Sequence, residues 1–180
     1  MYYRIDREQH NPGDVLNPFD LNDPKRANSN SNRDFFRTIM DSEERVKICL
    51  EQNENKGAAF GAAQTALREA VFEAVREKDF NELPCRFKTV MLFDNVQHAT
   101  NFKKNYRAGG YLYEVEVSAP EKMFVGDMQW LHFDLDDKNP AAKLKELAKN
   151  YWAGKKTDNP ILEYLTYKGQ TVQVIQQLPS

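Results

Sequence analysis

The strongest local signal in the sequence is an alternating run, Tyr111 to Val117, between the chain breakers Gly109-Gly110 and Ala119-Pro120. Alternation with a period of two is typical of a β-strand with one buried face, and it puts the odd-numbered residues of this run on that face. Gly and Pro on both sides limit the strand to this segment. The chain is therefore expected to contain a β-sheet, and the remaining patterns predict what packs against it.

Helical periodicity occurs on both sides of this strand. Just before it, Asp94 or Asn95 can cap a helix. The apolar side of that helix recurs every three or four residues: Val96, Ala99, Phe102 and Tyr106. A longer amphipathic pattern runs from Phe60 to about Asp79, with Arg68 and Glu69 on its polar face, and a weaker one covers residues 33–50. Another helix is expected to open at Asn139-Pro140, with proline in its first turn. Its inner, core-facing side is predicted to consist of apolar residues: Leu144, Leu147, Ala148, Tyr151 and Trp152.

Strand patterns occupy further segments: Tyr2–Ile5, Arg86–Phe93, Ile161–Tyr167 and Thr171–Leu178. The last two are joined at Lys168-Gly169-Gln170. Strands and helices therefore follow one another without regular βαβ alternation, which favours an α+β fold with a mostly antiparallel sheet. The length of 180 residues suits a single domain, 1–180, with a helical insertion at about 33–80.

Composition limits the partners and the compartment. Lys and Arg number 25 and Asp and Glu 27, so the formal net charge is −2, which gives no general attraction to nucleic acid or to a membrane. No apolar stretch approaches the roughly 18 residues that a membrane helix needs, and the first residues are too charged for a signal peptide. We therefore expect a cytoplasmic protein with no membrane partner.

Motifs for metals, nucleotides and hydrolases are missing from the sequence. It contains no Walker loop, no G-x-G-x-x-G and no G-x-S-x-G. The histidines His10, His98 and His132 do not have the spacing of metal ligands, so we expect no metal cofactor. The cysteines Cys49 and Cys85 lie far apart and are expected to be small buried hydrophobic residues.

Three segments carry the remaining chemical signal, and their order is informative. Tyr3-Arg4 ends the first strand, Thr89 supplies a hydroxyl within Arg86–Phe93, and Glu163 begins a late strand. In this order they resemble the Arg/Ser-Thr-Ser/Glu class of mono-ADP-ribosyltransferases, the class of the cholera toxin catalytic subunit. Residues 111–127 are similar to the strand-Ala-Pro-x-x-x-Phe stretch of the cholera-type enzymes. The resemblance covers residues 1–18 and 85–178.

This resemblance implies a fold, a reaction and a site. The fold is a pair of split antiparallel sheets around an NAD cleft, and NAD is the co-substrate. ADP-ribose is transferred to a macromolecular acceptor, a protein side chain or a nucleic-acid base, as in bacterial or phage toxins and effectors. An inhibitory partner protein would fit such a role. Glu163 would be catalytic, Arg4 would hold NAD and Thr89 would support the glutamate.

Other residues take supporting roles in the same prediction. Arg86 could clamp a phosphate, although pairing with a surface acid is the favoured interpretation, and Phe93 or Tyr106 could form an aromatic wall for nicotinamide. The segment after residue 125 offers candidates for a substrate loop: Asp127, Gln129 and Trp130. The chemistry suits these residue types, because a fixed carboxylate stabilises the positive charge that develops on ribose. Arginine suits the pyrophosphate, because its guanidinium stays charged and donates in two directions.

Two departures from the family pattern leave alternatives open. The hydroxyl motif has one hydroxyl, Thr89, rather than three, and Ile161 stands where arginine-modifying members carry Gln or Glu. Ile161 argues against arginine as the acceptor. A non-catalytic binding module on the same scaffold, or an NAD glycohydrolase with water as the acceptor, therefore remain alternatives. The binding module predicts that Arg4 and Glu163 lie far apart or face opposite sides of the sheet.

Overall fold

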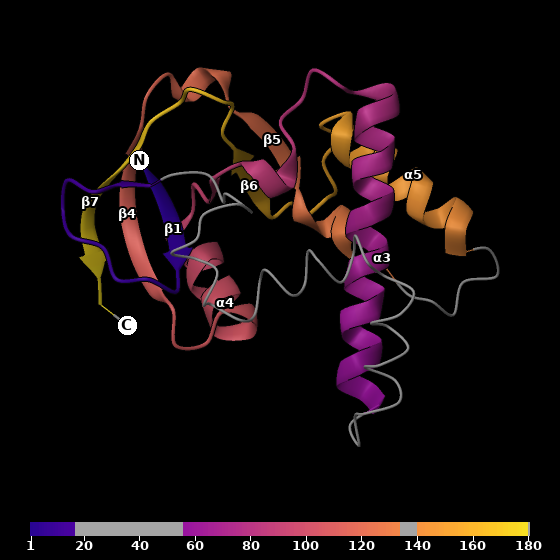
Figure 1. The fold of residues 1–180 in the computed structure, drawn as a ribbon, viewed down its shortest axis with the longest axis horizontal. Coiled ribbons are helices and arrows are strands. Elements are labelled where there is room, and N and C mark those ends of the chain that lie inside the picture. Colours follow the sequence, from indigo (N-terminus) through magenta and orange to yellow (C-terminus); the bar gives the residue numbers. More distant parts are fainter. Residues whose placement is uncertain (17–55, 134–139, 180) are drawn as a thin grey trace.

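A computed structural model describes residues 1–16, 56–133 and 140–179 of the chain. Two antiparallel sheets form its centre, and three α-helices pack against them within these residues (Figure 1). The architecture is α+β, as the order of the sequence patterns predicts. The helix expected at residues 33–50 lies outside the described residues, as does Cys49.

The first sheet has the strand order β1-β4-β7-β2. Its strands are β1 (Tyr2–Asp6), β4 (Tyr111–Val117), β7 (Val172–Leu178) and β2 (Val15–Leu16). The predicted strand at 111–117 is confirmed, and its odd-numbered residues face one core cluster while Leu112 faces another. Pairing of β4 with β7 shifts register between Glu114 and Val115.

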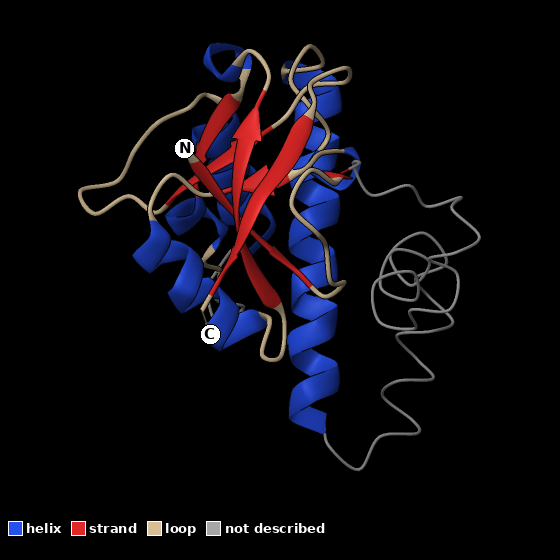
Figure 2. Cartoon of the chain, turned by 90° about the vertical axis from the view of Figure 1, so that its left-hand side faces the viewer, coloured by secondary structure: helices blue, strands red, loops and turns tan. Residues whose placement is uncertain are grey.

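The second sheet has the order β3-β6-β5, with β3 (Met91–Leu92), β6 (Leu162–Leu165) and β5 (Phe124–Asp127). It meets the first sheet where Tyr3 of β1 pairs with Phe93, just after β3. Their backbones exchange two hydrogen bonds, Tyr3 N to Phe93 O at 2.7 Å and Phe93 N to Tyr3 O at 2.9 Å. The strands cross in the view of Figure 2, where both sheets lie beside the long helix.

The helices cover different parts of this frame. α3 (Lys56–Asp79) packs against α5 (Pro140–Trp152), and α5 also contacts β5 of the second sheet. α4 (Val96–Tyr106) packs against β1 and β4 of the first sheet. The predicted end at Asp79 and the proline start at Pro140 are confirmed. Asn95 caps α4, because its side-chain oxygen accepts the N–H groups of the second and third helical residues.

Short 3-10 turns complete the chain: η1 (Arg86–Lys88), η2 (Pro120–Lys122) and η3 (Met128–Leu131). No helix of the described residues is both long enough and apolar enough to span a membrane.

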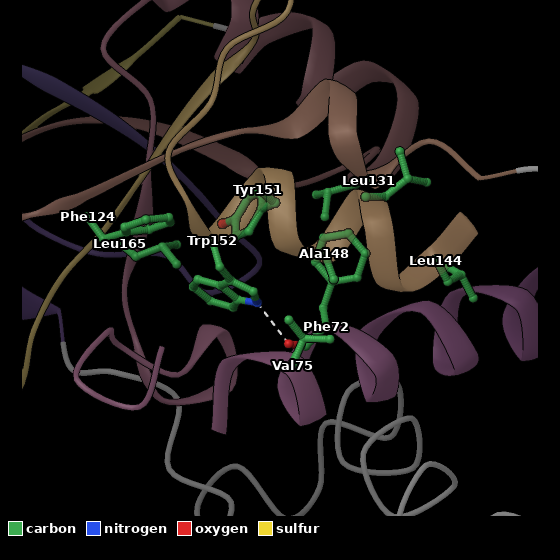
Figure 3. Packing of buried hydrophobic residues seen from close by; sticks show 10 residues of the cluster. Phe72, Val75, Phe124, Leu131, Leu144, Ala148, Tyr151, Trp152 and Leu165 are labelled. Atoms are coloured by element: carbon green, nitrogen blue, oxygen red, sulfur yellow. Dashed lines mark hydrogen bonds between the residues drawn. The ribbon is translucent and has the colours of Figure 1, made fainter. Parts of the chain in front are cut away.

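The largest core cluster joins α3 and α5 to the second sheet (Figure 3). Trp152 and Phe72 are almost wholly buried, and the Trp152 indole N–H donates to the Phe72 carbonyl at 2.8 Å. The predicted inner side of α5 is confirmed by burial of its apolar residues: Leu144, Leu147, Ala148, Tyr151 and Trp152. The C-terminal half of α3 is therefore part of the core.

The structure corrects three local predictions. The strand expected over Arg86–Phe93 begins instead with the η1 turn, and only Met91–Leu92 form a strand there. On α4, Val96 is 43 % exposed and Tyr106 is 61 % exposed, because the contact with the sheet is centred on Ala99. The two terminal strands are separated: β6 belongs to the second sheet and β7 to the first.

Candidate functional site

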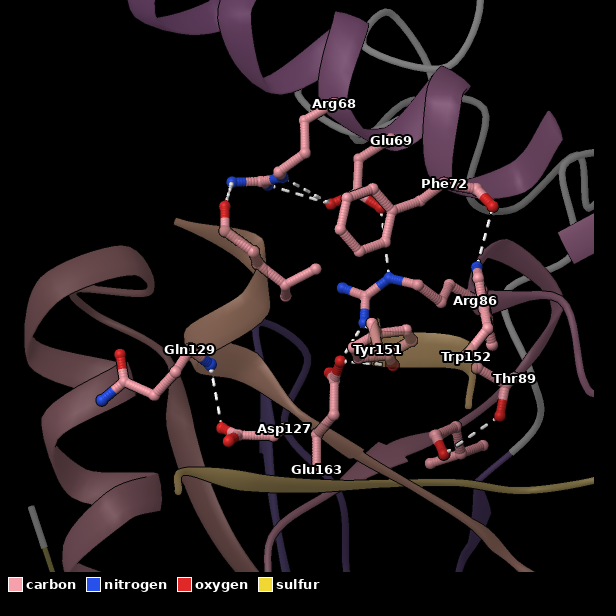
Figure 4. Close-up of polar contacts among 12 residues, drawn as sticks. Arg68, Glu69, Phe72, Arg86, Thr89, Asp127, Gln129, Tyr151, Trp152 and Glu163 are labelled. Carbon is pink, nitrogen blue, oxygen red and sulfur yellow. Dashed lines mark hydrogen bonds and ion pairs between the residues drawn. The ribbon is translucent and has the colours of Figure 1, made fainter. Parts of the chain in front are cut away.

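Glu163 lies at the centre of a buried polar cluster beneath α3 (Figure 4). It sits on β6, the middle strand of the second sheet, between β3 and β5. Successive residues of a strand point to opposite faces, so Glu163 and Leu165 face the core formed with α3 and α5 while Tyr164 faces the other way. The Glu163 side chain is fully buried.

Arg86 is the main partner of this carboxylate. The η1 turn directs its side chain under α3, where the side chain is only 7 % exposed. Its Nη1 forms an ion pair with Glu163 Oε1 and donates to the Tyr151 hydroxyl at 2.8 Å. Its Nε pairs with Glu69 Oε2 of α3 at 3.1 Å. The turn that replaces the predicted strand thus places a guanidinium between two carboxylates.

Tyr151 and Arg68 complete the cluster. The Tyr151 hydroxyl donates to Glu163 Oε1 at 2.6 Å, and the guanidinium of Arg86 lies 5.2 Å from the centre of the Tyr151 ring. Arg68 Nη2 pairs with Glu69 Oε1 at 2.9 Å, and Arg68 Nη1 donates to the Leu131 carbonyl at 3.1 Å. Two arginines therefore balance two glutamates, as burial of charge requires.

Burial and the neighbouring charges shift the pKa values of Arg86, Glu69 and Tyr151. Burial favours the neutral form of Arg86, but Glu163 and Glu69 outweigh it and raise the Arg86 pKa well above its ordinary value. Burial likewise opposes ionisation of Glu69, and its arginine partners overcome this and lower its pKa. Burial, with the charge of Glu163, raises the Tyr151 pKa well above its usual range. Tyr151 therefore remains a hydrogen-bond donor.

One carboxylate oxygen of the cluster has no hydrogen-bond donor among the described residues. Glu163 Oε2 is buried and has no hydrogen-bond partner among the described residues. A buried acceptor without a donor costs free energy, on the order of 1–3 kcal/mol. Such an atom is either a source of strain or an acceptor for a group that is bound during function.

The other predicted site residues lie around this cluster rather than in it. Thr89 donates through its hydroxyl to the Thr166 carbonyl at 2.8 Å, just beyond β6, and so supports the strand that carries Glu163 without contacting it. Phe93 is buried against Phe102, with ring centroids 5.3 Å apart. Tyr106 stacks on Phe102 at 5.1 Å at the exposed end of α4.

Arg4 is not in contact with Glu163. Its Nη1 donates to the Met91 carbonyl at 3.1 Å, and its Nη2 lies 3.5 Å from Asp6 Oδ2. Arg4 shares a strand face with Tyr2, whose ring packs against Tyr164 at 5.1 Å. Because Tyr164 and Glu163 point to opposite faces of β6, Arg4 of β1 lies on the Tyr164 side of β6, opposite to the side that Glu163 faces.

One protein-family model matches the part of the chain that contains all of these residues. A family model described as "Protein of unknown function (DUF2441)" matches residues 2–178. The chain belongs to this family. A search among curated proteins finds no match. The match spans the strands, the η1 turn and α5, so every residue of the polar cluster lies within the DUF2441 region.

In this DUF2441 member, Asp127 is an anchor for a loop. It is 1 % exposed, and both of its carboxylate oxygens are occupied. Oδ1 accepts the N–H groups of Gln129 and Ile161, each at 3.0 Å, and Oδ2 accepts the N–H and the hydroxyl of Thr157, each at 2.8 Å. Burial would raise the Asp127 pKa, but these donors outweigh it and lower the pKa.

Gln129 and Trp130 fasten the same loop from the η3 turn. The Gln129 side-chain amide donates to the Asn159 carbonyl at 3.2 Å, and the Trp130 indole donates to the Lys155 carbonyl at 2.8 Å. The three residues predicted as a substrate loop therefore act together to hold residues 155–161 against η3. That loop leads directly into β6 and Glu163.

Replacing Asp127 with Asn should destabilise the fold by about 2 kcal/mol, because an amide nitrogen would face donors that now meet a carboxylate oxygen. Urea unfolding at pH 7 measures this loss, and Asp158→Asn, an exposed substitution in the same loop, is the control. Since the folded-state pKa of Asp127 is lowered, its contribution is present above the unfolded pKa, about 4, and is lost as pH falls through the folded pKa. The stability gap between wild type and Asp127→Asn should therefore shrink in acid; a constant gap would contradict the assignment.

Sequence reasoning did not identify Glu69, Tyr151 or Arg68 as members of the site. Glu69 and Arg68 were assigned to the polar face of a helix, and Tyr151 was assigned to the core. Their convergence with Arg86 and Glu163 joins positions 69, 86, 151 and 163, which no spacing in the sequence connects. Among the described residues, no group of three or more His, Cys, Asp or Glu side chains is placed to hold a metal ion.

Proposed function

We propose that this chain transfers ADP-ribose from NAD to a macromolecular acceptor and releases nicotinamide. The observation that carries the proposal is the lateral order of the strands with the three resembling segments. β3 pairs with β6 in the register Leu92 to Tyr164, and continuing this register by one residue sets Phe93 opposite Glu163. Phe93 in turn pairs with Tyr3, next to Arg4. The first strand, the second segment and the glutamate strand are thus neighbours, and this adjacency of the three resembling segments supports the proposal.

The proposed chemistry uses the free oxygen of Glu163. In the reaction, the bond between ribose C1′ and the nicotinamide nitrogen breaks, and its electron pair leaves with nicotinamide. The acceptor then bonds to C1′ and loses a proton. Glu163 Oε2 would accept a ribose hydroxyl and stabilise the positive charge on the sugar as it develops. Arg86 and Tyr151 hold the other oxygen and so fix the orientation of the carboxylate.

The proposal requires that the cover of Glu163 opens. Glu163 is fully buried, so NAD can reach it only if the side chains from α3 and α5 move away. The polar residue of this cover is Glu69, which forms an ion pair with Arg86. On the N-terminal side of Glu69, α3 is held by side-chain hydrogen bonds to backbone carbonyls: Gln64 donates to Phe133 and Arg68 donates to Leu131. These hydrogen bonds would be exchanged for bonds to water when the cover opens.

One observation favours the alternative of a non-catalytic module on the same scaffold. Glu163 and Arg86 are buried and paired with each other, which is also how a structural ion pair is built. Arg4, on β1 of the first sheet, has its own partners and lies on the side of β6 opposite to the one that Glu163 faces. In that case the cluster would only hold α3 against the second sheet, and the protein would bind a partner through its surface without catalysis.

The proposal predicts that the purified protein consumes NAD and that Glu163→Gln loses this activity. Removing the carboxylate charge should lower nicotinamide release about 100-fold or more, because transition-state stabilisation of this kind typically supplies that factor. Chromatography measures nicotinamide, and transfer of a labelled adenylate group to lysate protein or nucleic acid reports the acceptor. Glu116→Gln, the same change at an exposed position on β4, is the matched control.

The outcomes separate the alternatives. Attached label that disappears only with Glu163→Gln supports the transferase, provided that thermal unfolding shows both variants folded. Free ADP-ribose without attached label identifies an NAD glycohydrolase. If the folded wild-type protein consumes no NAD with any lysate fraction, the enzymatic proposal is wrong. The binding module would then be the remaining alternative.

A further inference from the structure

The last turn of α4 presents positive charge on a chain whose formal net charge is −2. No Asp or Glu occurs between Asp94 and Glu114, a stretch that contains the whole of α4. Lys103 and Lys104 lie in the last turn of the helix, where Lys104 is exposed and Lys103 is half-buried. Neither lysine forms an ion pair with another residue of the part of the chain that the structure describes. The described part of the fold therefore leaves the charge of these two lysines without a carboxylate partner.

An exposed aromatic ring adjoins these lysines. Phe93, Phe102 and Tyr106 form a row of rings from the core to the surface, with centroids 5.3 Å apart for the first pair and 5.1 Å apart for the second. Phe93 is 2 % exposed, whereas Tyr106 is 61 % exposed. The row supports the Tyr106 ring from its inner side, because each ring rests on the one before it. Tyr106 therefore offers an aromatic surface to solvent that loses little side-chain entropy when it is covered.

Tyr106 and Lys103 lie on the same side of the helix. Residues three apart in an α-helix are neighbours on its surface, and Lys104 is the next residue around the same turn. Lysines in a last turn also stabilise a helix through its dipole, which accounts for their charge but not for an exposed tyrosine ring beside them. Proteins bind single-stranded nucleic acid with this combination, since bases stack on aromatic rings and phosphates pair with cations. The last turn of α4 has the chemistry of such a surface.

We propose that the last turn of α4 binds single-stranded nucleic acid, with a base stacked on Tyr106 and the neighbouring phosphates paired with Lys103 and Lys104. A single strand fits better than a duplex, because the bases of a duplex already stack on each other and offer no free face to the ring. This binding goes beyond the proposed transfer reaction, because it needs neither NAD nor the carboxylate of Glu163.

An anionic membrane surface fits this turn less well. A helix that lies on a bilayer does so through a broad apolar face. The apolar side of α4 faces the first sheet instead, where Ala99 is fully buried and Phe102 packs on Phe93. The large apolar side chains that α4 exposes are Val96 and Tyr106, which are its first and last residues. They lie at opposite ends of the helix and form no continuous apolar face.

Fluorescence anisotropy of a short labelled oligothymidylate, titrated with the full chain, tests the surface. Tyr106→Ala should weaken binding on the order of tenfold, because stacking of one base is typically worth that factor. Tyr106→Phe keeps the ring and should bind as the wild type does. Lys103→Gln should weaken binding and reduce the slope of log affinity against log salt by about 0.7, the contribution of one phosphate contact. Lys78→Gln, the same change at an exposed position in the last turn of α3, is the matched control and should alter neither quantity.

Thermal unfolding shows that each variant is folded, and if Tyr106→Ala is not, the affinity and salt slope of Lys103→Gln decide. These measurements contain no NAD, so their result is independent of whether the protein consumes NAD. Binding of the strand by wild type that is weakened in Tyr106→Ala and Lys103→Gln supports the proposal. No binding by wild type at low salt, equal binding by Tyr106→Ala, or tighter binding of a duplex of the same length would each overturn it. Binding to phosphatidylserine vesicles without binding to the strand would also overturn it and would identify a lipid surface as the ligand.

Discussion

Replacing Arg86 with Met should destabilise the protein by about 3–5 kcal/mol, the range typical of breaking a buried ion pair. Among the residues that the structure describes, the substitution removes the one guanidinium that contacts both Glu163 and Glu69, and it leaves the fully buried Glu163 carboxylate with the Tyr151 hydroxyl as its remaining partner. Urea unfolding followed by tryptophan fluorescence measures the change, since Trp152 lies in the adjoining core.

Two further variants show whether the loss comes from unpaired charge. Lys88→Met removes an exposed cation from the same η1 turn and should change stability by no more than about 0.5 kcal/mol. The double variant Arg86→Met with Glu163→Leu should be more stable than Arg86→Met alone, because it removes the uncompensated carboxylate as well. A double variant as unstable as the sum of the two single changes would show that Arg86 acts by packing instead.

This ion pair also shows where sequence reasoning reached its limit. Residues Arg86 to Phe93 carry a strand-like pattern, and the prediction extended the strand to Arg86. In the fold, the hydrogen bonds and charge pairs available to a buried guanidinium outweigh the local preference, and the chain turns at η1. A local pattern cannot report this, because the competing partners come from α3, α5 and β6.

The elements that were predicted correctly are those decided by short-range physics. The strand at Tyr111–Val117 follows from alternation between breakers, and α5 follows from a proline at its first turn and an apolar stripe. The Asn95 cap is likewise a local hydrogen-bond arrangement. Pairing of strands is different. β6 and β7 are consecutive in the chain yet enter different sheets, since each completes a sheet whose other strands lie far away in sequence.

The sequence identifies only some members of the buried polar cluster, for the same reason. Arg86 and Glu163 were both singled out, and they form an ion pair, but the sequence gives no means of pairing them with each other rather than Glu163 with Arg4. Glu69 sits among several charged residues on one helix, and only its position opposite Arg86 distinguishes it. Whether a charged side chain is buried thus depends on how the helices and sheets pack together, and only the three-dimensional structure shows it.

Replacing Gly126 with Ala should have an effect of similar size, about 3 kcal/mol or more, at the upper end of what overpacking a core costs. Gly126 lies on β5 opposite Glu163, and a Cβ there would come within 2.7 Å of the Tyr151 hydroxyl oxygen and nearer still to the ring. The ring has little room to move aside, because Trp152, Phe72 and Phe124 pack around it with centroids 4.8–5.6 Å away.

Displacing the Tyr151 ring would also withdraw the hydroxyl from Glu163, so the Gly126→Ala variant should lose NAD consumption together with stability if Glu163 is catalytic. Gly13→Ala is the control for backbone strain alone. Gly13 has a φ of 94° and open space around its Cβ position, so alanine there should cost only about 1 kcal/mol. Thermal and urea unfolding compare the two. Equal stability of the two alanine variants would mean that β5 and α5 can separate without loss, and that the second sheet does not hold Tyr151 against Glu163 as rigidly as the packing indicates.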